Sequence, residues 1–400
     1  MSVSRRGFLQ VFGTDRSAPL AGAFIAARGL EAHLAEARQG FDKTGRPLGP
    51  PMPGEVRISS NENPLGPGKT ALDAILGKFP EAGRYPFNAT PLDSDLVAAI
   101  AKKYGAKPEN VVMGAGSQEI LRNAVIELTS PALPLTTGFP SYESPTNLAK
   151  QLGHPVREVK VDSELRLDVE PMIAAAKGAG LVFFNNPNNP TATVHGAKTV
   201  TDFVERVRKS SPDTVILIDE AYHDYVTDPS YGTMIPLALA TPNVIVARTF
   251  SKAYGMAGLR IGYGIGQADT MKRLAKRKMP YNVSTFSVAA AIASLGDQAH
   301  IDAERARNTE VRAYTMKALE DLGCKPTASQ ANFLFVDIHR PTKDFREACA
   351  KSLVMVGRDF PPFEKTHARI SVGTMDEMVK ATEVFRSVLR ATTSTNGRQQ

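Results

Sequence analysis

Four short apolar segments constrain the fold of this 400-residue chain more than any other feature. They are rich in Val, Ile, Leu and Phe, and they span residues 111–113, 181–184, 215–218 and 244–247. Continuous apolar segments of this length are typical of strands that are buried on both faces of a parallel sheet. Helical patterns lie between them. The sequence therefore predicts an α/β domain over residues 87–295, in which helices cover a mainly parallel sheet.

The rest of the chain predicts a second, smaller unit. Residues 296–390 contain a long helical pattern at 303–322 and fewer strands, which favours a small α+β domain. The Pro- and Gly-rich residues 46–86 predict an N-terminal arm that contributes to this small domain. The polar residues 391–400 predict a disordered tail.

A lysine and a carboxylate follow two of the apolar segments. Lys252 lies a few residues after 244–247, and Asp219 comes directly after 215–218. The carboxyl ends of parallel strands meet at one edge of a sheet, where α/β proteins bind ligands. Burial there favours the neutral amine of a lysine, a nucleophile that forms Schiff bases with aldehydes. Taken alone, an exposed loop lysine and a helix-capping aspartate are equally compatible with these positions.

A glycine turn follows the segment at 111–113. Gly114, Gly116 and Ser117 separate this predicted strand from a predicted helix. Such a turn binds phosphate through free backbone N–H groups and the helix dipole. A dinucleotide-binding turn needs a third glycine, and Glu119 occupies that place, which disfavours NAD.

Seven motifs together resemble the fold-type I pyridoxal-phosphate (PLP) enzymes, and within them the histidinol-phosphate aminotransferase group. The resemblance covers about residues 55–390. The motifs are Asn61-Glu62-Asn63-Pro64, Arg84-Tyr85-Pro86, Gly114-Ala115-Gly116-Ser117, Asn186-Pro187-Asn188-Asn189-Pro190-Thr191, Asp219-Glu220-Ala221-Tyr222, Ser251-Lys252 with Gly258-Leu259-Arg260, and Arg369-Ile370-Ser371-Val372-Gly373.

The resemblance implies a site for pyridoxal 5'-phosphate and a role for each residue in it. Lys252 would hold the cofactor as a Schiff base and shuttle a proton, and Asp219 would keep the pyridinium nitrogen protonated. The other implied contacts are Asn189 and Tyr222 at the phenolic oxygen, Tyr142 on the ring face, Gln118, and Gly116, Ser117, Ser251 and Arg260 around the phosphate. Tyr85 would reach the phosphate of a neighbouring subunit, which implies a homodimer with shared active sites, partly formed by the arm at 46–86.

Three further residues are implied in substrate binding. Arg369 matches the arginine that binds the substrate α-carboxylate, or the phosphate that replaces it in histidinol phosphate. Asn63 belongs to the first motif. Arg358 lies where the family has a second arginine near the anionic end of the substrate, although a solvated Arg358 fits the sequence equally well. The family usually has glycine where this chain has Ala192, and alanine fits if its φ is negative.

The sequence thus predicts a PLP-dependent aminotransferase. It would exchange an amino group between an amino acid, or a histidinol-phosphate-like amine, and a 2-oxo acid such as 2-oxoglutarate. The alternatives are a PLP-dependent decarboxylase of the same fold and an exported, non-catalytic ligand-binding relative. The presence of Lys252, Asp219 and Asn189 argues against the non-catalytic relative, which would have no chemical need for all three.

The first residues resemble an export signal. Arg5 and Arg6 precede Gly7-Phe8-Leu9, as in twin-arginine signals, and a weakly apolar stretch follows at 18–27. That stretch is too short to span a bilayer. Residues 1–45 are therefore predicted to be a signal that directs the protein to the periplasm, or an extension of a cytoplasmic protein that covers a partner subunit. Because histidine synthesis is cytoplasmic, an exported relative would act on another amino acid or on a secondary metabolite.

Charge and cysteine content exclude other classes of function. The net charge is +7, but Lys and Arg are scattered, which is not typical of a nucleic-acid-binding surface. Two cysteines, Cys324 and Cys349, provide neither a disulfide framework nor a zinc site. No segment is long and apolar enough to predict a transmembrane helix. The composition therefore favours small-molecule partners.

Overall fold

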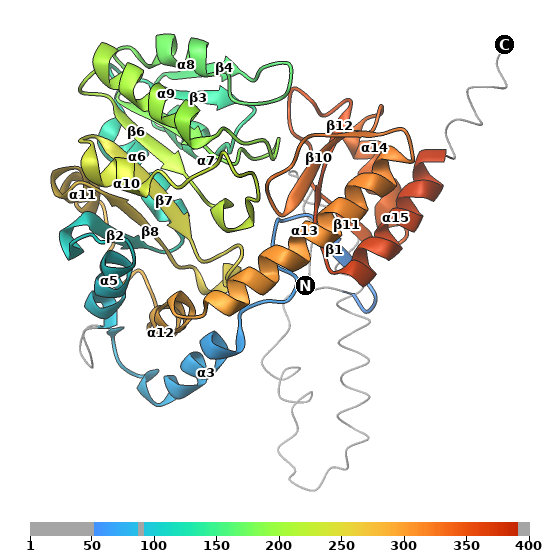
Figure 1. The fold of residues 1–400 in the computed structure, drawn as a ribbon, viewed down its shortest axis with the longest axis horizontal. Coiled ribbons are helices and arrows are strands. Elements are labelled where there is room, and N and C mark those ends of the chain that lie inside the picture. Colours follow the sequence, from blue (N-terminus) through green and yellow to red (C-terminus); the bar gives the residue numbers. More distant parts are fainter. Residues whose placement is uncertain (1–51, 87–91, 391–400) are drawn as a thin grey trace, which may run out of the picture.

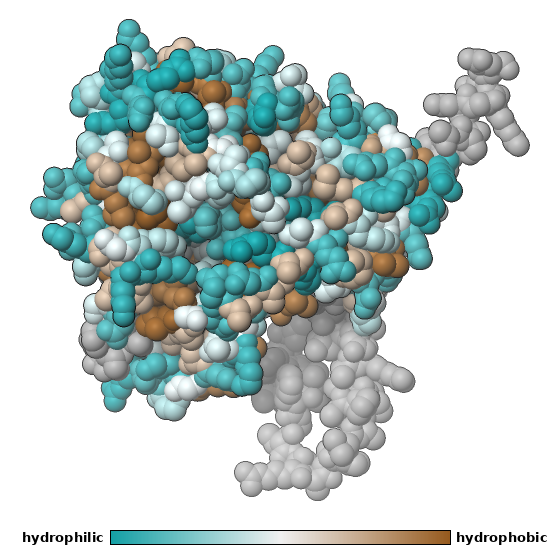
Figure 2. All heavy atoms as spheres, viewed as in Figure 1, coloured by the Kyte–Doolittle hydropathy of each residue, from teal (hydrophilic) through white to brown (hydrophobic). Residues whose placement is uncertain are grey.

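The computed structural model describes residues 52–86 and 92–390. The signal predicted around Arg5 and Arg6 and the tail predicted at 391–400 lie outside these residues. Figure 1 shows a large part built around one sheet, a small part with the C-terminal helices, and helix α13 (Gln298–Glu320) running between them. The face in Figure 2 is mainly hydrophilic, with small hydrophobic areas scattered over it. Within the described residues, no helix combines the length and the apolar character needed to cross a membrane.

A seven-stranded sheet forms the centre of the large part, in the order β2-β8-β7-β6-β5-β3-β4. The strands are β2 (Val111–Gly114), β3 (Leu135–Phe139), β4 (Val156–Lys160), β5 (Leu181–Asn185), β6 (Val215–Asp219), β7 (Val244–Thr249) and β8 (Gly262–Gly266). All neighbours pair in parallel except β8, which is antiparallel to both β2 and β7. The predicted α/β fold with a mainly parallel sheet is therefore confirmed.

Each central strand is buried on both faces, as the continuous apolar segments predict. Along β6, Ile216 and Ile218 pack in one hydrophobic cluster, whereas Val215 and Leu217 pack in another. Helices cover both sides of the sheet. One face packs against α6 (Ser117–Leu128), α7 (Ser144–Gln151) and α11 (Ala268–Ala275). The other packs against α5 (Leu92–Lys103), α8 (Val169–Ala176), α9 (Ala197–Ser210), α10 (Ile235–Ala240) and α12 (Thr285–Leu295).

The small part is a separate hydrophobic cluster built from both ends of the chain. Strand β1 (Val56–Ile58), from the N-terminal arm, pairs in parallel with β11 (Val354–Val356). Strand β10 (Phe333–Asp337) lies between β12 (His367–Ser371) and β9 (Lys325–Pro326), antiparallel to both. Helices α14 (Thr342–Ala350) and α15 (Met375–Arg390) complete it, and helix α3 (Lys69–Gly77) of the arm contacts α12.

Helix α13 begins about five residues earlier than the apolar pattern at 303–322 predicts. The Asp297 carboxylate accepts a hydrogen bond from the backbone N–H of His300 at 3.1 Å, so it caps the helix at this point. A side-chain cap of this kind satisfies one of the otherwise unpaired N–H groups of the first turn. The start of the helix is therefore set by a polar residue that the apolar pattern does not include.

Candidate active site

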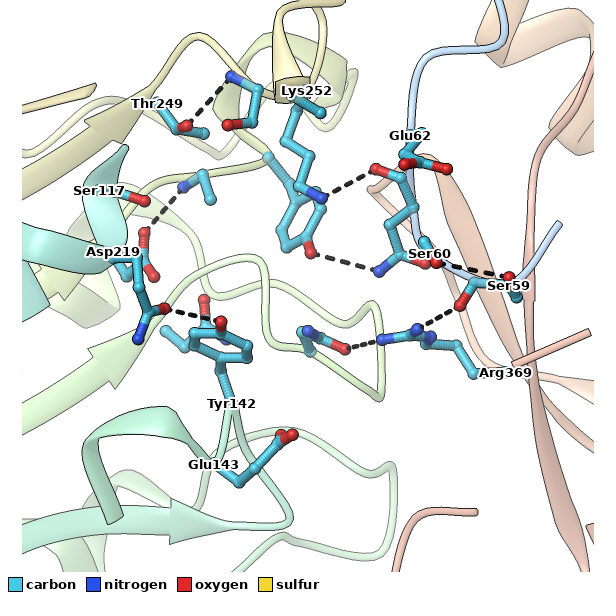
Figure 3. A pocket seen from close by; sticks show the side chains of 18 of the residues that line it. Ser59, Ser60, Glu62, Ser117, Tyr142, Glu143, Asp219, Thr249, Lys252 and Arg369 are labelled. Atoms are coloured by element: carbon cyan, nitrogen blue, oxygen red, sulfur yellow. Dashed lines mark hydrogen bonds between the residues drawn. The ribbon is translucent and has the colours of Figure 1, made fainter. Parts of the chain in front are cut away.

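A cavity of about 710 Å³ lies between the carboxyl ends of the central strands and the small part. Figure 3 shows Lys252, Asp219, Arg369 and Glu143 approaching it from different sides. Most of the residues predicted from the sequence line it, namely Ser117, Gln118, Tyr142, Asn189, Asp219, Tyr222, Ser251, Lys252, Arg260, Arg358 and Arg369. The parallel strands β5, β6 and β7 end at this edge of the sheet, which is why their following loops meet here.

The amine of Lys252 projects into the cavity from the loop after β7. Its Nζ donates a hydrogen bond to the backbone oxygen of Asn61 at 2.9 Å and lies 5.6 Å from the centre of the Tyr222 ring. Burial, and next the positive charge of Arg369, lower the pKa of the Lys252 amine to about 8. A substantial fraction of this amine is therefore neutral near physiological pH, as a nucleophile or a base requires.

Asp219 is the last residue of β6 and is buried. One carboxylate oxygen accepts a hydrogen bond from the backbone N–H of Ala221 at 3.1 Å. Burial raises the pKa of the Asp219 carboxyl to about 7. A cationic N–H donor in the cavity would offset this burial and return the group to its ionised form.

Gly116 and Arg260 form a cradle at the N-terminus of α6. Gly116 has a φ of 77°, and a Cβ atom there would lie 2.4 Å from Nη2 of Arg260. Arg260 donates hydrogen bonds to the backbone oxygen of Ala257 at 2.7 Å and to the hydroxyl of Ser251 at 3.3 Å. Glycine therefore lets the guanidinium approach the start of the helix at Ser117, where the first N–H groups of the helix lie. This arrangement suits a phosphate dianion.

Two tyrosines complete the part of the cavity between Asp219 and Lys252. The Tyr142 hydroxyl donates a hydrogen bond to Oε1 of Gln118 at 2.8 Å. The Tyr222 hydroxyl accepts one from the side-chain amide of Asn61 at 3.2 Å. Burial raises the pKa of the Tyr222 hydroxyl above its ordinary value, so this group stays protonated and remains a hydrogen-bond donor.

Arg369, on β12, is the cation on the small-part side. One guanidinium nitrogen donates to the side-chain oxygen of Asn189 at 2.9 Å, and another donates to the backbone oxygen of Ser59 at 2.7 Å. The guanidinium carbon lies 4.6 Å from the centre of the Phe360 ring. These contacts fix a planar, two-pronged donor at the cavity, which is the geometry that binds carboxylates.

Asn63, predicted to bind substrate, lies outside the cavity lining, whereas Tyr85 is predicted to reach the site of a neighbouring subunit. The Asn63 amide donates to the backbone oxygen of Ala253 at 3.0 Å, so Asn63 holds the loop that carries Lys252 and is absent from the cavity lining. Tyr85 is 65% exposed and its ring lies 5.1 Å from that of Tyr281. Asn61 lines the cavity instead. Sequence reasoning missed it, although its motif contains asparagine at both positions.

Ala192 adopts a φ of 61°, so the expectation of a negative φ is wrong. Its N–H donates to the Asn188 carbonyl at 2.7 Å, and its own carbonyl accepts from the Gln330 N–H at 2.9 Å. These two bonds hold the tight turn that closes the amide-rich loop. The left-handed conformation costs an alanine about 1–2 kcal/mol, which the buried loop tolerates.

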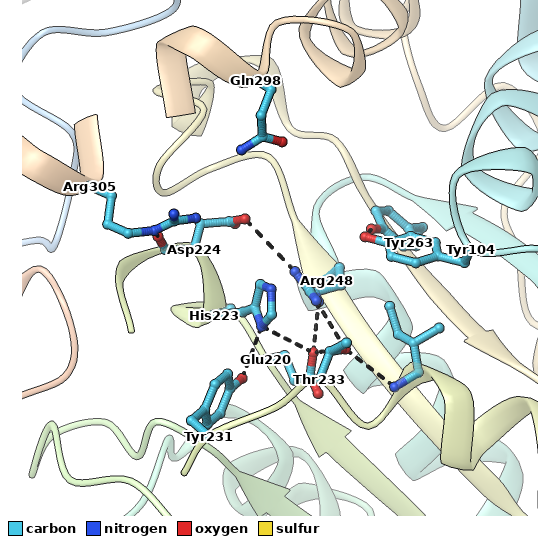
Figure 4. Close-up of polar contacts among 12 residues, drawn as sticks. Tyr104, Glu220, His223, Asp224, Tyr231, Thr233, Arg248, Tyr263, Gln298 and Arg305 are labelled. Carbon is cyan, nitrogen blue, oxygen red and sulfur yellow. Dashed lines mark hydrogen bonds and ion pairs between the residues drawn. The ribbon is translucent and has the colours of Figure 1, made fainter. Parts of the chain in front are cut away.

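A buried polar network surrounds Glu220, the residue after Asp219 in the sequence (Figure 4). Nε of Arg248, on β7, donates to Oε2 of Glu220 at 2.8 Å, and Nη2 donates to the Thr233 hydroxyl at 3.1 Å. The other oxygen of Glu220 accepts from the N–H of Met234 at 2.6 Å. Glu220 contributes to the raised pKa of its neighbour Asp219, so its pairing with Arg248 bears on the charge of the site. No local pattern in the sequence indicates this pair.

Pyridoxal 5'-phosphate fits these groups. The cavity offers an amine for the aldehyde at Lys252, a buried carboxyl for the ring nitrogen at Asp219, and a phosphate cradle at Gly116 and Arg260. Lys252, Asp219 and Arg260 all line this one cavity.

Comparisons with known proteins agree with this fit. A profile of the family described as aminotransferase class I and II matches residues 53–385. The chain belongs to this family. It is 34% identical over 338 residues to the histidinol-phosphate aminotransferase of Moorella thermoacetica, covering 84% of this chain and 85% of the relative. It is 35% identical over 329 residues to the aromatic amino acid aminotransferase of Mycolicibacterium paratuberculosis, covering 82% and 90%.

Solved structures give the same result. The histidinol-phosphate aminotransferase of Sinorhizobium meliloti, in complex with pyridoxal-5'-phosphate, superposes with a TM-score of 0.76 at 29% identity, covering 84% of this chain and 91% of that one. A putative histidinol-phosphate aminotransferase from Erwinia carotovora gives a TM-score of 0.81 at 30% identity, covering 86% and 98%. The chain is a PLP-dependent aminotransferase, so the predicted family, cofactor and enzyme class are confirmed.

Proposed function

We propose that this aminotransferase exchanges an amino group between an amino acid, or a histidinol-phosphate-like amine, and a 2-oxo acid such as 2-oxoglutarate. The observation that carries the proposal is that Arg369 and Lys252 line one cavity. Arg369 presents a fixed two-pronged donor for the acidic end of the substrate. Lys252 presents an amine whose pKa is lowered to about 8. The substrate α-carbon would then lie between Arg369, which binds the acidic end of the substrate, and Lys252, which transfers the proton.

Each of the residues that line the cavity has its own role in the reaction. Arg369 binds the acidic end of the substrate, and the Asn61 carbonyl holds the Lys252 amine in the cavity. When bound, the cofactor supplies an electron sink that stabilises negative charge at the substrate α-carbon. Lys252 would remove the proton from the α-carbon of the amino donor and, in the second half-reaction, deliver a proton to the α-carbon of the 2-oxo acid. Asp219 supplies the negative charge that keeps the ring nitrogen protonated.

The proposal includes a homodimer. Large apolar side chains are exposed along α3 and the segments near it, and Tyr85 and Tyr281 lie together among them. The exposed set is Leu65, Leu72, Leu76, Phe79, Tyr85, Met279 and Tyr281. Exposed apolar patches of this kind mark protein–protein contacts. A second subunit that binds at this patch would bring Tyr85 near the active site of its partner. Size-exclusion chromatography with light scattering tests the homodimer, since it measures the mass of the particle in solution.

Export through a twin-arginine pathway is also part of the proposal. It rests on Arg5 and Arg6 and the apolar stretch that follows them. Replacing both arginines by lysine is expected to leave the protein in the cytoplasmic fraction. An unchanged distribution between periplasm and cytoplasm would remove this part of the proposal.

A donor screen tests the central part. The purified enzyme is incubated with 2-oxoglutarate and a panel containing aromatic, dicarboxylic and apolar amino acids and histidinol phosphate. Transamination yields an oxo product and glutamate, whereas a decarboxylase yields CO₂. Arg369→Lys keeps the positive charge but loses the two-pronged N–H donor, and Arg369→Met loses the charge and the donor. The proposal expects KM to rise in the order wild type, Lys, Met. Equal KM values for all three would refute the role of Arg369.

A further inference from the structure

A cross-domain ion pair lies at the end of the cavity opposite Lys252. Arg358, in the segment between β11 and β12 of the small part, pairs with Glu143, which directly precedes α7 of the large part. Both side chains line the cavity, and Figure 3 shows Glu143 on the side away from Lys252. Arg358 also donates to the backbone oxygen of Asp359 at 2.9 Å. The pair therefore links the two parts of the protein across the site.

The same pair lies next to a second cavity. A smaller cavity of about 190 Å³ is also lined by Glu143 and Arg358. Its other walls include Thr146, Asn147 and Lys150 of α7. Both cavities are lined by these two side chains, so the pair lies where the two cavities adjoin. The Arg358–Glu143 pair thus sets how far a ligand in the main cavity extends.

Arg358 and Arg369 lie against the same aromatic ring. Their guanidinium carbons are 4.2 Å and 4.6 Å from the centre of Phe360. A substrate whose acidic end is bound by Arg369 therefore has its remote end within reach of Arg358. At this remote end, the positive charge of Arg358 is already balanced by the Glu143 carboxylate, with which it forms an ion pair.

We propose that Glu143 determines substrate specificity by occupying Arg358. The proposal rests on the function proposed above and names its preferred donor class: amino acids with an uncharged side chain. A second carboxylate or a phosphate at the remote end, the second carboxylate of 2-oxoglutarate included, would be repelled by Glu143 and would have to displace it from Arg358 before binding. An uncharged remote end, such as an aromatic ring, leaves the pair intact. Discrimination by a repulsive charge of this kind is a general route to specificity.

The test compares amino donors in single turnovers of the cofactor-loaded enzyme. No 2-oxo acid acceptor is present, so the charge of the acceptor does not affect the measured rates. L-Phenylalanine represents uncharged side chains, and L-aspartate and L-glutamate represent anionic ones. Glu143→Gln keeps the size of the side chain and removes its charge. We expect it to raise the second-order rate constant of the anionic donors, relative to that of phenylalanine, by about two- to fivefold, which is the range that a partly exposed charge contributes. Adding Arg358→Gln to this variant is expected to abolish the gain.

Glu109→Gln is the matched control, because Glu109 is exposed in the turn before β2 and belongs to neither cavity. An unchanged donor ratio in Glu143→Gln, with all donors still turned over, would overturn the specificity role alone. An equal loss of activity with every donor would show that Glu143 has a structural role, and this result would also overturn its specificity role. A wild-type enzyme that transaminates no donor would overturn the proposed function, and the inference with it.

Discussion

Replacing Asp219 by asparagine should stabilise the cofactor-free protein at neutral pH and weaken its binding of the cofactor. In the cofactor-free protein, burial raises the pKa of this carboxyl from its ordinary 3.8 to about 7. A carboxyl with a raised pKa in the folded state stabilises the fold only while it is protonated. Its contribution is present below about pH 4 and is lost as the pH rises to about 7. At about 1.4 kcal/mol per pH unit, the loss reaches about 4 kcal/mol.

Asparagine cannot ionise, yet its side-chain oxygen still accepts the N–H of Ala221. The cofactor-free Asp219→Asn variant should therefore match the wild type near pH 4 and exceed its free energy of unfolding by up to about 4 kcal/mol at pH 8. With cofactor bound, the variant loses a charged hydrogen bond worth about 1.5–3 kcal/mol, so its cofactor affinity should fall tenfold or more.

Urea unfolding between pH 4 and pH 8 measures the first effect, and a cofactor titration measures the second. Asp213→Asn is the matched control, since Asp213 is exposed near the other end of β6. A stability difference between Asp219→Asn and the wild type that stays constant over this pH range would refute the reasoning. So would unchanged cofactor affinity.

Three further outcomes follow from the geometry. Gly116→Ala should weaken cofactor binding measured by fluorescence titration, because a φ of 77° strains an alanine and a Cβ there, 2.4 Å from the Arg260 guanidinium, pushes that group out of the cradle; unaltered affinity would contradict this. Labelling of Lys252 by an amine reagent in the cofactor-free protein should have its midpoint near pH 8, and a midpoint above pH 10 would count against it. Arg248→Met should lower the urea-derived stability by about 3–5 kcal/mol, because Glu220 is left buried and unpaired; adding Glu220→Leu should recover much of the loss.

The sheet and most of the cavity could be predicted because both follow from local patterns. Continuous apolar segments indicate buried parallel strands, and parallel strands bring their carboxyl ends to one edge. Asp219 ends one such strand and Lys252 lies in the loop after the next, so their sharing of a cavity is a consequence of topology. The antiparallel direction of β8 has no comparable local signal, since an apolar segment does not reveal its direction.

The remaining features depend on partners that are distant in the chain. Asn61 holds Lys252 through a backbone oxygen, a contact that side-chain patterns do not indicate. The Arg358–Glu143 pair joins residues 215 positions apart. Ala192 is left-handed because two hydrogen bonds fix its turn, one of them from Gln330. Each of these depends on how the small part sits against the sheet, which no local window of sequence contains.

The most direct test of the account is to locate the covalent link between protein and cofactor. The cofactor-loaded enzyme is reduced with borohydride, digested and analysed by mass spectrometry. We expect a phosphopyridoxyl group on Lys252 and on no other lysine, and we expect none in the Lys252→Ala variant. A modified lysine elsewhere, or a fully active enzyme without modified Lys252, would contradict the central claim.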